Sequence, residues 1–218
     1  MLSILVILAF AVAAFITGSI KSDEEAPMPL KLSNRLGKLW DIAHQGMREN
    51  RFLRAEKALL TILKIDEKNA AAYNRLGILY AKQKEFKDAI DCFEIASSIE
   101  PSASSLHNLG LIYYETEHYE KAALAFEQAL KLEDKSAARH IAYAKVQEKL
   151  GNHKVVLSEL ELAAELEPNV ESFKLLHKTY TDRGMTEQAS VIERRLSKMT
   201  VSKKEKRRKI LRPKRVVV

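Results

Sequence analysis

The chain has 218 residues, of which 46% are apolar, and carries a net charge of +7. This length suffices for one extended domain with a sizeable core. The single cysteine, Cys92, excludes an internal disulfide framework and a four-cysteine zinc site. Seven glycines, five prolines and few strand-like runs outside the two ends argue for an all-helical fold.

The N-terminal segment from Leu2 to Ile20 is a run of 19 uncharged residues. As a helix it would extend roughly 28 Å, close to the thickness of a hydrocarbon core. We therefore predict a transmembrane anchor over residues 1–21. Lys21, Lys31 and Arg35 follow the run and no basic residue precedes it, so the positive-inside rule places the rest of the chain in the cytoplasm. The expected product is a single-pass membrane protein whose C-terminal part faces the cytoplasm.

Two other interpretations of this segment stay open. A cleaved secretory signal would release an exported protein, and Ala11-Val12-Ala13 resembles a cleavage site, although the usual charged leading region is missing. A soluble core helix is the second alternative, but such a helix is not normally apolar on every face. The following residues 22–35 contain acids and two prolines, and we predict a linker there.

The stretch from Ala70 to Ser102 contains two amphipathic segments, separated by polar residues 82–85 and closed by Pro101. This pattern predicts an antiparallel helix pair. The same residue types return 33 positions later. The matched positions are Leu76 and Leu109, Gly77 and Gly110, Tyr80 and Tyr113, Ala89 and Ala122, Phe93 and Phe126, and Ala96 and Ala129. Such an internal repeat predicts stacked helix pairs.

Residues 70–135 resemble two consecutive tetratricopeptide repeats. That family shows an aromatic residue, Leu-Gly, Tyr, a small residue, an aromatic, another small residue and Pro, at a period of about 34 residues. The resemblance implies a right-handed α-solenoid whose small residues lie where two helices cross closely. A lone pair cannot bury its apolar face, so neighbouring pairs must stack.

Extended in both directions, the pattern gives five units over residues 36–199. Their expected bounds are 36–69, 70–102, 103–136, 137–169 and 170–199. The later units depart from the family pattern, with Val156 at a position where a small alanine is usual and Glu193 where an aromatic is expected. Such degeneration suits a terminal unit that has no successor to pack against.

By analogy with the family, the first helix of each unit lines an inner groove. The candidate partner-binding residues are Trp40, His44, Met47, Asn74, Ile78, Lys82, His107, Leu111, Tyr114, Ile141, Lys145, Glu148, Lys174, Lys178 and Thr181. The N-terminal half of this set is aromatic and apolar, and the C-terminal half is rich in lysine. This favours a peptide with apolar anchors at one end and acids at the other. The competing interpretation is that Trp40 and Met47 only pack on the linker or on neighbouring helices.

The sequence contains no motif that would carry catalysis. It has no Gly-rich phosphate loop, no Gly-x-Ser-x-Gly elbow and no His-Glu-x-x-His. Its six histidines are scattered one or two per unit, whereas an active site needs convergent groups. We expect a protein that is not an enzyme, with no cofactor, no metal site and no small-molecule substrate.

The C-terminal tail, residues 200–218, is dense in positive charge. From Lys198 onward there are ten basic residues and one acid, so this end carries +9 and the rest of the chain carries −2. The basic residues of the tail are Lys203, Lys204, Lys206, Arg207, Arg208, Lys209, Arg212, Lys214 and Arg215. A block of one sign repels itself, and we predict a disordered tail. Three roles stay open: a solvated end, contact with anionic lipid, and phosphate neutralisation on RNA such as the ribosome.

Taken together, these features favour a membrane-anchored scaffold whose repeats hold a protein or peptide partner. One alternative is a ribosome- or RNA-associated factor that acts through the basic tail. The other is an exported repeat protein with a cleaved signal.

Overall fold

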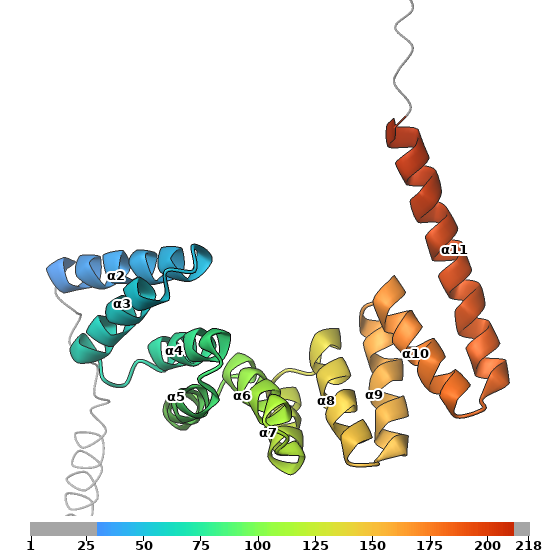
Figure 1. Ribbon diagram of the computed structural model, residues 1–218, viewed down its shortest axis with the longest axis horizontal. Helices are drawn as coiled ribbons and strands as arrows, with labels where there is room; N and C mark the ends of the chain where they lie inside the picture. Colours follow the sequence, from blue (N-terminus) through green and yellow to red (C-terminus); the bar gives the residue numbers. More distant parts are fainter. Residues whose placement is uncertain (1–29, 212–218) are drawn as a thin grey trace, which may run out of the picture.

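The computed structural model describes residues 30–211, which form ten helices and no strand within that range. The helices form five antiparallel pairs that follow one another along an arc (Figure 1). The pairs are α2 (Leu30–Arg48) with α3 (Phe52–Ile65), α4 (Ala70–Gln83) with α5 (Phe86–Ile99), α6 (Ala103–Glu115) with α7 (Tyr119–Leu132), α8 (Ala137–Lys149) with α9 (His153–Leu166), and α10 (Val170–Asp182) with α11 (Thr186–Leu211). The all-helical solenoid expected from the repeats is confirmed.

The predicted anchor at residues 1–21 lies outside the described residues. Among the helices of residues 30–211, none is both long enough and apolar enough to cross a membrane.

Local side-chain chemistry sets several helix boundaries. The Asn69 side chain accepts a hydrogen bond from the Ala72 backbone N–H at 2.9 Å and so starts α4. At α10, Asn169 accepts from the Ser172 backbone N–H while the Ser172 hydroxyl accepts from the Asn169 backbone, which completes a capping box. Gly151, in the turn between α8 and α9, has φ of 75°, a left-handed conformation that glycine adopts without strain.

Within each pair, small residues let the two helices cross closely. Gly77 of α4 faces the ring of Phe93 in α5, and Gly110 of α6 faces the ring of Phe126 in α7. The buried side chains form three groups along the solenoid: the first includes Leu59 and Leu76, the second Phe93 and Phe126, and the third Leu160 and Leu176. Ile78 and Tyr80, for example, pack against both the first and the second group of buried residues. Each pair thus buries its apolar face against its neighbours, as stacking of repeats requires.

Tyrosine hydroxyls form hydrogen bonds between neighbouring helix pairs. The Tyr80 hydroxyl of α4 donates a hydrogen bond to Glu56 of α3 at 2.9 Å, and Tyr180 of α10 donates to Glu161 of α9 at 2.6 Å. Burial and then the carboxylate of Glu161 raise the pKa of Tyr180 to about 12, so the hydroxyl stays protonated and donates. These bonds fix the rotation of one pair relative to the next.

The first helix begins earlier than expected. α2 starts at Leu30, whereas residues 22–35 were predicted to be a linker. Leu32 and Leu36 are half-buried at helical spacing and precede Leu39, which packs on the first core group. The apolar face of the first pair therefore extends the helix beyond the family pattern.

The last helix continues further than expected. Residues 200–211 were predicted to be disordered, but α11 runs on to Leu211 and extends past the start of α10 (Figure 1). Lys, Arg, Glu and Leu have high helix propensity, and elongating a helix that is already packed avoids the cost of nucleation. These two effects outweigh the like-charge repulsion on which the prediction of disorder was based. Residues 212–218 lie outside the described residues.

Candidate partner-binding groove

A first cavity of about 740 Å³ lies between α2 and α4. Its lining residues are Asp41, His44, Gln45, Met47, Arg48, Arg75, Ile78 and Lys82. Arg48, Arg75 and Lys82 are exposed, and none of them forms an ion pair with another residue that the structure describes. These three cations outnumber the one carboxylate, Asp41, so we call this cavity the basic pocket.

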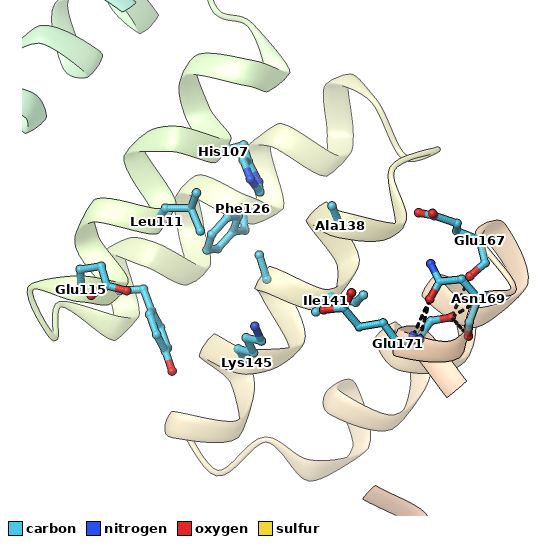
Figure 2. Close-up of a pocket in the computed structure, with 13 residues that line it drawn as sticks. His107, Leu111, Glu115, Phe126, Ala138, Ile141, Lys145, Glu167, Asn169 and Glu171 are labelled. Atoms are coloured by element: carbon cyan, nitrogen blue, oxygen red, sulfur yellow. Dashed lines mark hydrogen bonds between the residues drawn. The ribbon is translucent and has the colours of Figure 1, made fainter. Parts of the chain in front are cut away.

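A second cavity of about 390 Å³ lies between α6, α8 and the start of α10 (Figure 2). It is lined by His107, Leu111, Tyr114, Glu115, Phe126, Ala138, Ile141, Ala142, Lys145, Glu167, Asn169, Glu171 and Ser172. Glu115, Glu167 and Glu171 are exposed, and their carboxylates form no ion pair within residues 30–211. They outnumber the one ammonium group of Lys145, so we call this cavity the acidic pocket. Its apolar wall includes Leu111, which is 39% exposed.

His107 contributes a neutral ring to the acidic pocket. Its ring lies edge-on to Phe126, with 5.3 Å between the centroids. Burial, and secondarily the positive charge of Arg139, lower the pKa of His107. Its Nδ1 atom is buried and has no hydrogen-bond partner in the described part of the chain.

Two asparagines bridge the first helices α4 and α6. The Asn108 amide donates a hydrogen bond to the Asn74 oxygen at 3.4 Å. This bond leaves the Asn74 amide nitrogen and the Asn108 oxygen without a partner among residues 30–211. A free donor and a free acceptor side by side are what an extended peptide backbone requires.

The C-terminal end of the groove is closer to charge balance. A small cavity of about 130 Å³ between α8 and α10 is lined by Lys145 and Lys178 and also by Glu148 and Asp182. Glu148 in turn accepts from Arg183 at 3.0 Å. Lys145 and Lys178 therefore share this cavity with two acids.

Comparison with known families identifies the repeats. Residues 68–135 match one tetratricopeptide repeat family model, and residues 107–166 match a second. Residues 68–166 are tetratricopeptide repeats. The repeats expected from the matched positions of residues 70–135 are thereby confirmed.

Several solved structures have a similar fold, and three of them illustrate the range of similarity. A crystal structure of MamA has 19% identity and a TM-score of 0.69, over 75% of this chain and 97% of that one. MamA from Desulfovibrio magneticus RS-1 has 12% identity and a TM-score of 0.69, over 77% and 96%. YrrB, described as a TPR protein with an unusual peptide-binding site, has 20% identity and a TM-score of 0.62, over 84% and 91%. Identities this low show the fold alone. A search of curated proteins gave no match.

The structure gathers many of the predicted groove residues at the two pockets. His44, Met47, Ile78 and Lys82 line the basic pocket. His107, Leu111, Tyr114, Ile141 and Lys145 line the acidic pocket. Residues of α2 and α4 therefore line one pocket, and residues of α6 and α8 line the other.

Other predicted residues lie elsewhere. Trp40 packs against the core of the first pair, with its ring centroid 5.6 Å from that of His44, and it lines neither pocket. Met47 lines the basic pocket but is only 8% exposed. Lys174 is exposed and lines none of the three cavities described above. Lys203 to Lys209 fall on the last part of α11, and Arg212, Lys214 and Arg215 lie outside the described residues.

The charge along the groove differs from the expected order, because several charged residues were missed. Arg48 and Glu115 occupy the same repeat position as Lys82, 34 residues before it and 33 residues after it. Applying one register to all units would have found both. Glu167 and Glu171 come from the junction of α9 and α10, which no pattern on the first helices indicates. The basic end of the groove is thus N-terminal, and the acids lie near its middle.

Proposed function

We propose that this protein is a non-enzymatic scaffold that binds an extended segment of a partner protein in the groove lined by α2, α4, α6 and α8. The observation that carries the proposal is the pair of pockets on these first helices, each with an apolar wall and unpaired charges. Exposed apolar surface beside uncompensated charge adds little to the stability of a fold, and it suits recognition. The peptide-binding site by which YrrB is described supports the same use of a similar fold.

Site-specific crosslinking tests the groove. A photoreactive residue at Tyr114 and another at Lys82 should capture the same partner in cells. The matched control is Leu124 of α7, which is 56% exposed on the second helix of the same pair as Tyr114. Crosslinks from the two groove positions should be lost when Leu111→Asp places a charge on the apolar wall. Equal capture from Leu124, or capture that survives Leu111→Asp, would contradict the proposal.

The scaffold is also proposed to be held at the cytoplasmic face of a membrane by residues 1–21. The 19 uncharged residues from Leu2 and the basic residues after them support this placement. After an alkaline wash, the intact chain should stay with the membrane fraction, with its N-terminal segment still attached. A mature form that starts near Ser19 would instead support an exported protein with a cleaved signal.

The basic end of the chain remains a separate prediction. A helix that carries Lys203 to Lys209 beyond the last packed pair suits contact with a phosphate-bearing surface, either anionic lipid or RNA. Deleting residues 200–218 should remove salt-sensitive binding to such a surface and leave capture in the groove intact. If the deletion variant no longer captured the partner in the groove, the tail would instead contribute to binding of that partner.

A further inference from the structure

We propose that the groove recognises the order of charges along its partner. Acidic side chains of an extended peptide occupy the basic pocket, and a basic side chain at least about five or six residues away occupies the acidic pocket. This inference rests on the groove being the binding site, as proposed above, and it specifies which chemistry the groove accepts.

Among the described residues, the three cations of the basic pocket form no ion pair, and Asp41 is the one carboxylate that lines the cavity with them. Arg48, Arg75 and Lys82 come from two different helices, α2 and α4, and converge on one cavity. Like charges held close together repel, and a bound carboxylate removes that repulsion. Arginine adds a planar pair of donors that fits a carboxylate in two parallel hydrogen bonds. The apolar side of Met47 and Ile78 gives such a ligand a surface to pack against.

The acidic pocket favours a positively charged ligand. Glu115 lies on the α6 wall, and Glu167 and Glu171 lie across the cavity at the junction of α9 and α10 (Figure 2). At the start of α10, the Asn169 oxygen already accepts from the backbone N–H groups of Glu171 and Ser172, so these two donors are not free to bind an anion. Leu111 and Tyr114 can contact the aliphatic stem and the charged end of a lysine or arginine.

The spacing of the two pockets sets a lower limit on the spacing of the charges. The basic pocket lies between α2 and α4, and the acidic pocket lies between α6, α8 and the start of α10, so their centres are at least two spacings of the first helices apart. Packed helices lie about 8–10 Å apart, so this separation is at least roughly 16–20 Å. An extended peptide covers about 3.3 Å per residue, so at least five or six residues are needed to span the distance. Asn74 and Asn108, on the helices between the pockets, offer the free amide groups for its backbone.

The probe is a displayed library of random peptides of about twelve residues, roughly twice the minimum spacing, selected on the purified full chain. Enriched peptides should carry acids at one end and a lysine or arginine at least about five residues away. A scrambled peptide of the same composition should bind at least about tenfold more weakly in calorimetry.

Charge variants test each pocket against a matched change elsewhere. Arg48→Glu with Arg75→Glu should weaken the selected peptide at least about tenfold, whereas Arg54→Glu with Lys57→Glu, on exposed residues of α3, should not. Glu115→Lys with Glu171→Lys, in the acidic pocket, should also weaken binding of the selected peptide at least about tenfold. The control for this change is Glu67→Lys with Glu193→Lys, which alters two exposed acids outside the pocket. The variant that combines both pocket changes should prefer a peptide whose acidic and basic residues are exchanged. A misfolded protein cannot produce that gain.

The outcomes separate this inference from the proposed function. Peptides that need Leu111 but show no charge order would overturn the charge inference and leave the groove as the binding site. An absence of enriched peptides, or peptides indifferent to Leu111→Asp and to both charge variants, would overturn both.

Discussion

The ring of Phe93 fills the space that a side chain on Gly77 would need. A Cβ atom placed on Gly77 would lie 2.7 Å from the nearest ring carbon, and a Cβ on Gly110 would lie 2.9 Å from the ring of Phe126. Both distances are shorter than real side-chain contacts allow. By contrast, a Cβ on Gly37, also within a helix, would meet nothing within 4 Å. Close packing therefore requires glycine at positions 77 and 110 but not at position 37.

Alanine at these positions should have opposite effects. Gly77→Ala should lower the free energy of unfolding by about 1–3 kcal/mol, because Phe93 must move away from its packed position. Gly37→Ala should raise it by up to about 1 kcal/mol through helix propensity alone. Urea denaturation followed by circular dichroism measures both changes. Similar effects from the two substitutions would show that the helices of the second pair do not cross at Gly77.

The hydrogen bond between Tyr80 and Glu56 should couple the first and second pairs. A double-mutant cycle of Tyr80→Phe and Glu56→Gln should give an interaction energy of about 1 kcal/mol or more, since the acceptor is charged and both side chains are half-buried. Tyr73→Phe is the control, because the Tyr73 hydroxyl has no hydrogen-bond partner among residues 30–211. Additive effects at Tyr80 and Glu56 would argue that the bond does not link the pairs.

The repeats could be predicted from the sequence, because each close helix crossing requires the same residue types at the same positions of every repeat. Gly77 and Gly110 mark the close crossings, and Phe93 and Phe126 mark the rings that fill them, in one register 33 residues apart. Only certain residues fit such positions, so residue type and structure correspond closely there.

The outer bounds of α2 and α11 and the charges of the groove could not be predicted from such a pattern. The start at Leu30 and the extension to Leu211 depend on packing and helix propensity outside the repeated unit. Trp40 has the register of a groove residue but turns its ring toward the core of the first pair. Glu167 and Glu171 reach the acidic pocket only because the turn between α9 and α10 brings them there. A surface position tolerates many residue types, so its role appears only when neighbouring helices are placed.

Stability should decline in mild acid partly because of His107. Burial and the nearby Arg139 lower its pKa in the folded state below the ordinary value of 6.5. Below that pH the unfolded chain takes up a proton that the folded chain does not, so the free energy of unfolding falls as the pH falls toward the folded-state pKa. One such proton contributes at most about 1.4 kcal/mol per pH unit. His107→Gln should remove this component, and the difference between the two unfolding curves from pH 7 to pH 5 isolates it from other groups. Parallel curves would contradict the prediction.

Cys92 should react slowly while the protein is folded. Burial, followed by the charges of Asp88 and Asp91, raises the pKa of its thiol to about 11, so little thiolate exists near neutral pH. Modification by a disulfide reagent at pH 8 should be at least about a hundredfold slower than in urea, because it requires local opening. Leu124→Cys in a Cys92→Ala background supplies an exposed thiol on the same fold as the control. Comparable rates at the two positions would show that the Cys92 site is open.

The principal helix contacts join each element to the next one or two along the chain. Within residues 30–211, therefore, no helix distant in sequence packs against α2 or α11, and unfolding should spread inward from the terminal pairs rather than occur in one concerted step. Amide exchange should then slow progressively from α2 and α11 toward α6 and α7. The middle of the array, where the acidic pocket lies, would outlast the outer pairs and keep part of the groove intact under conditions that already loosen both extremities.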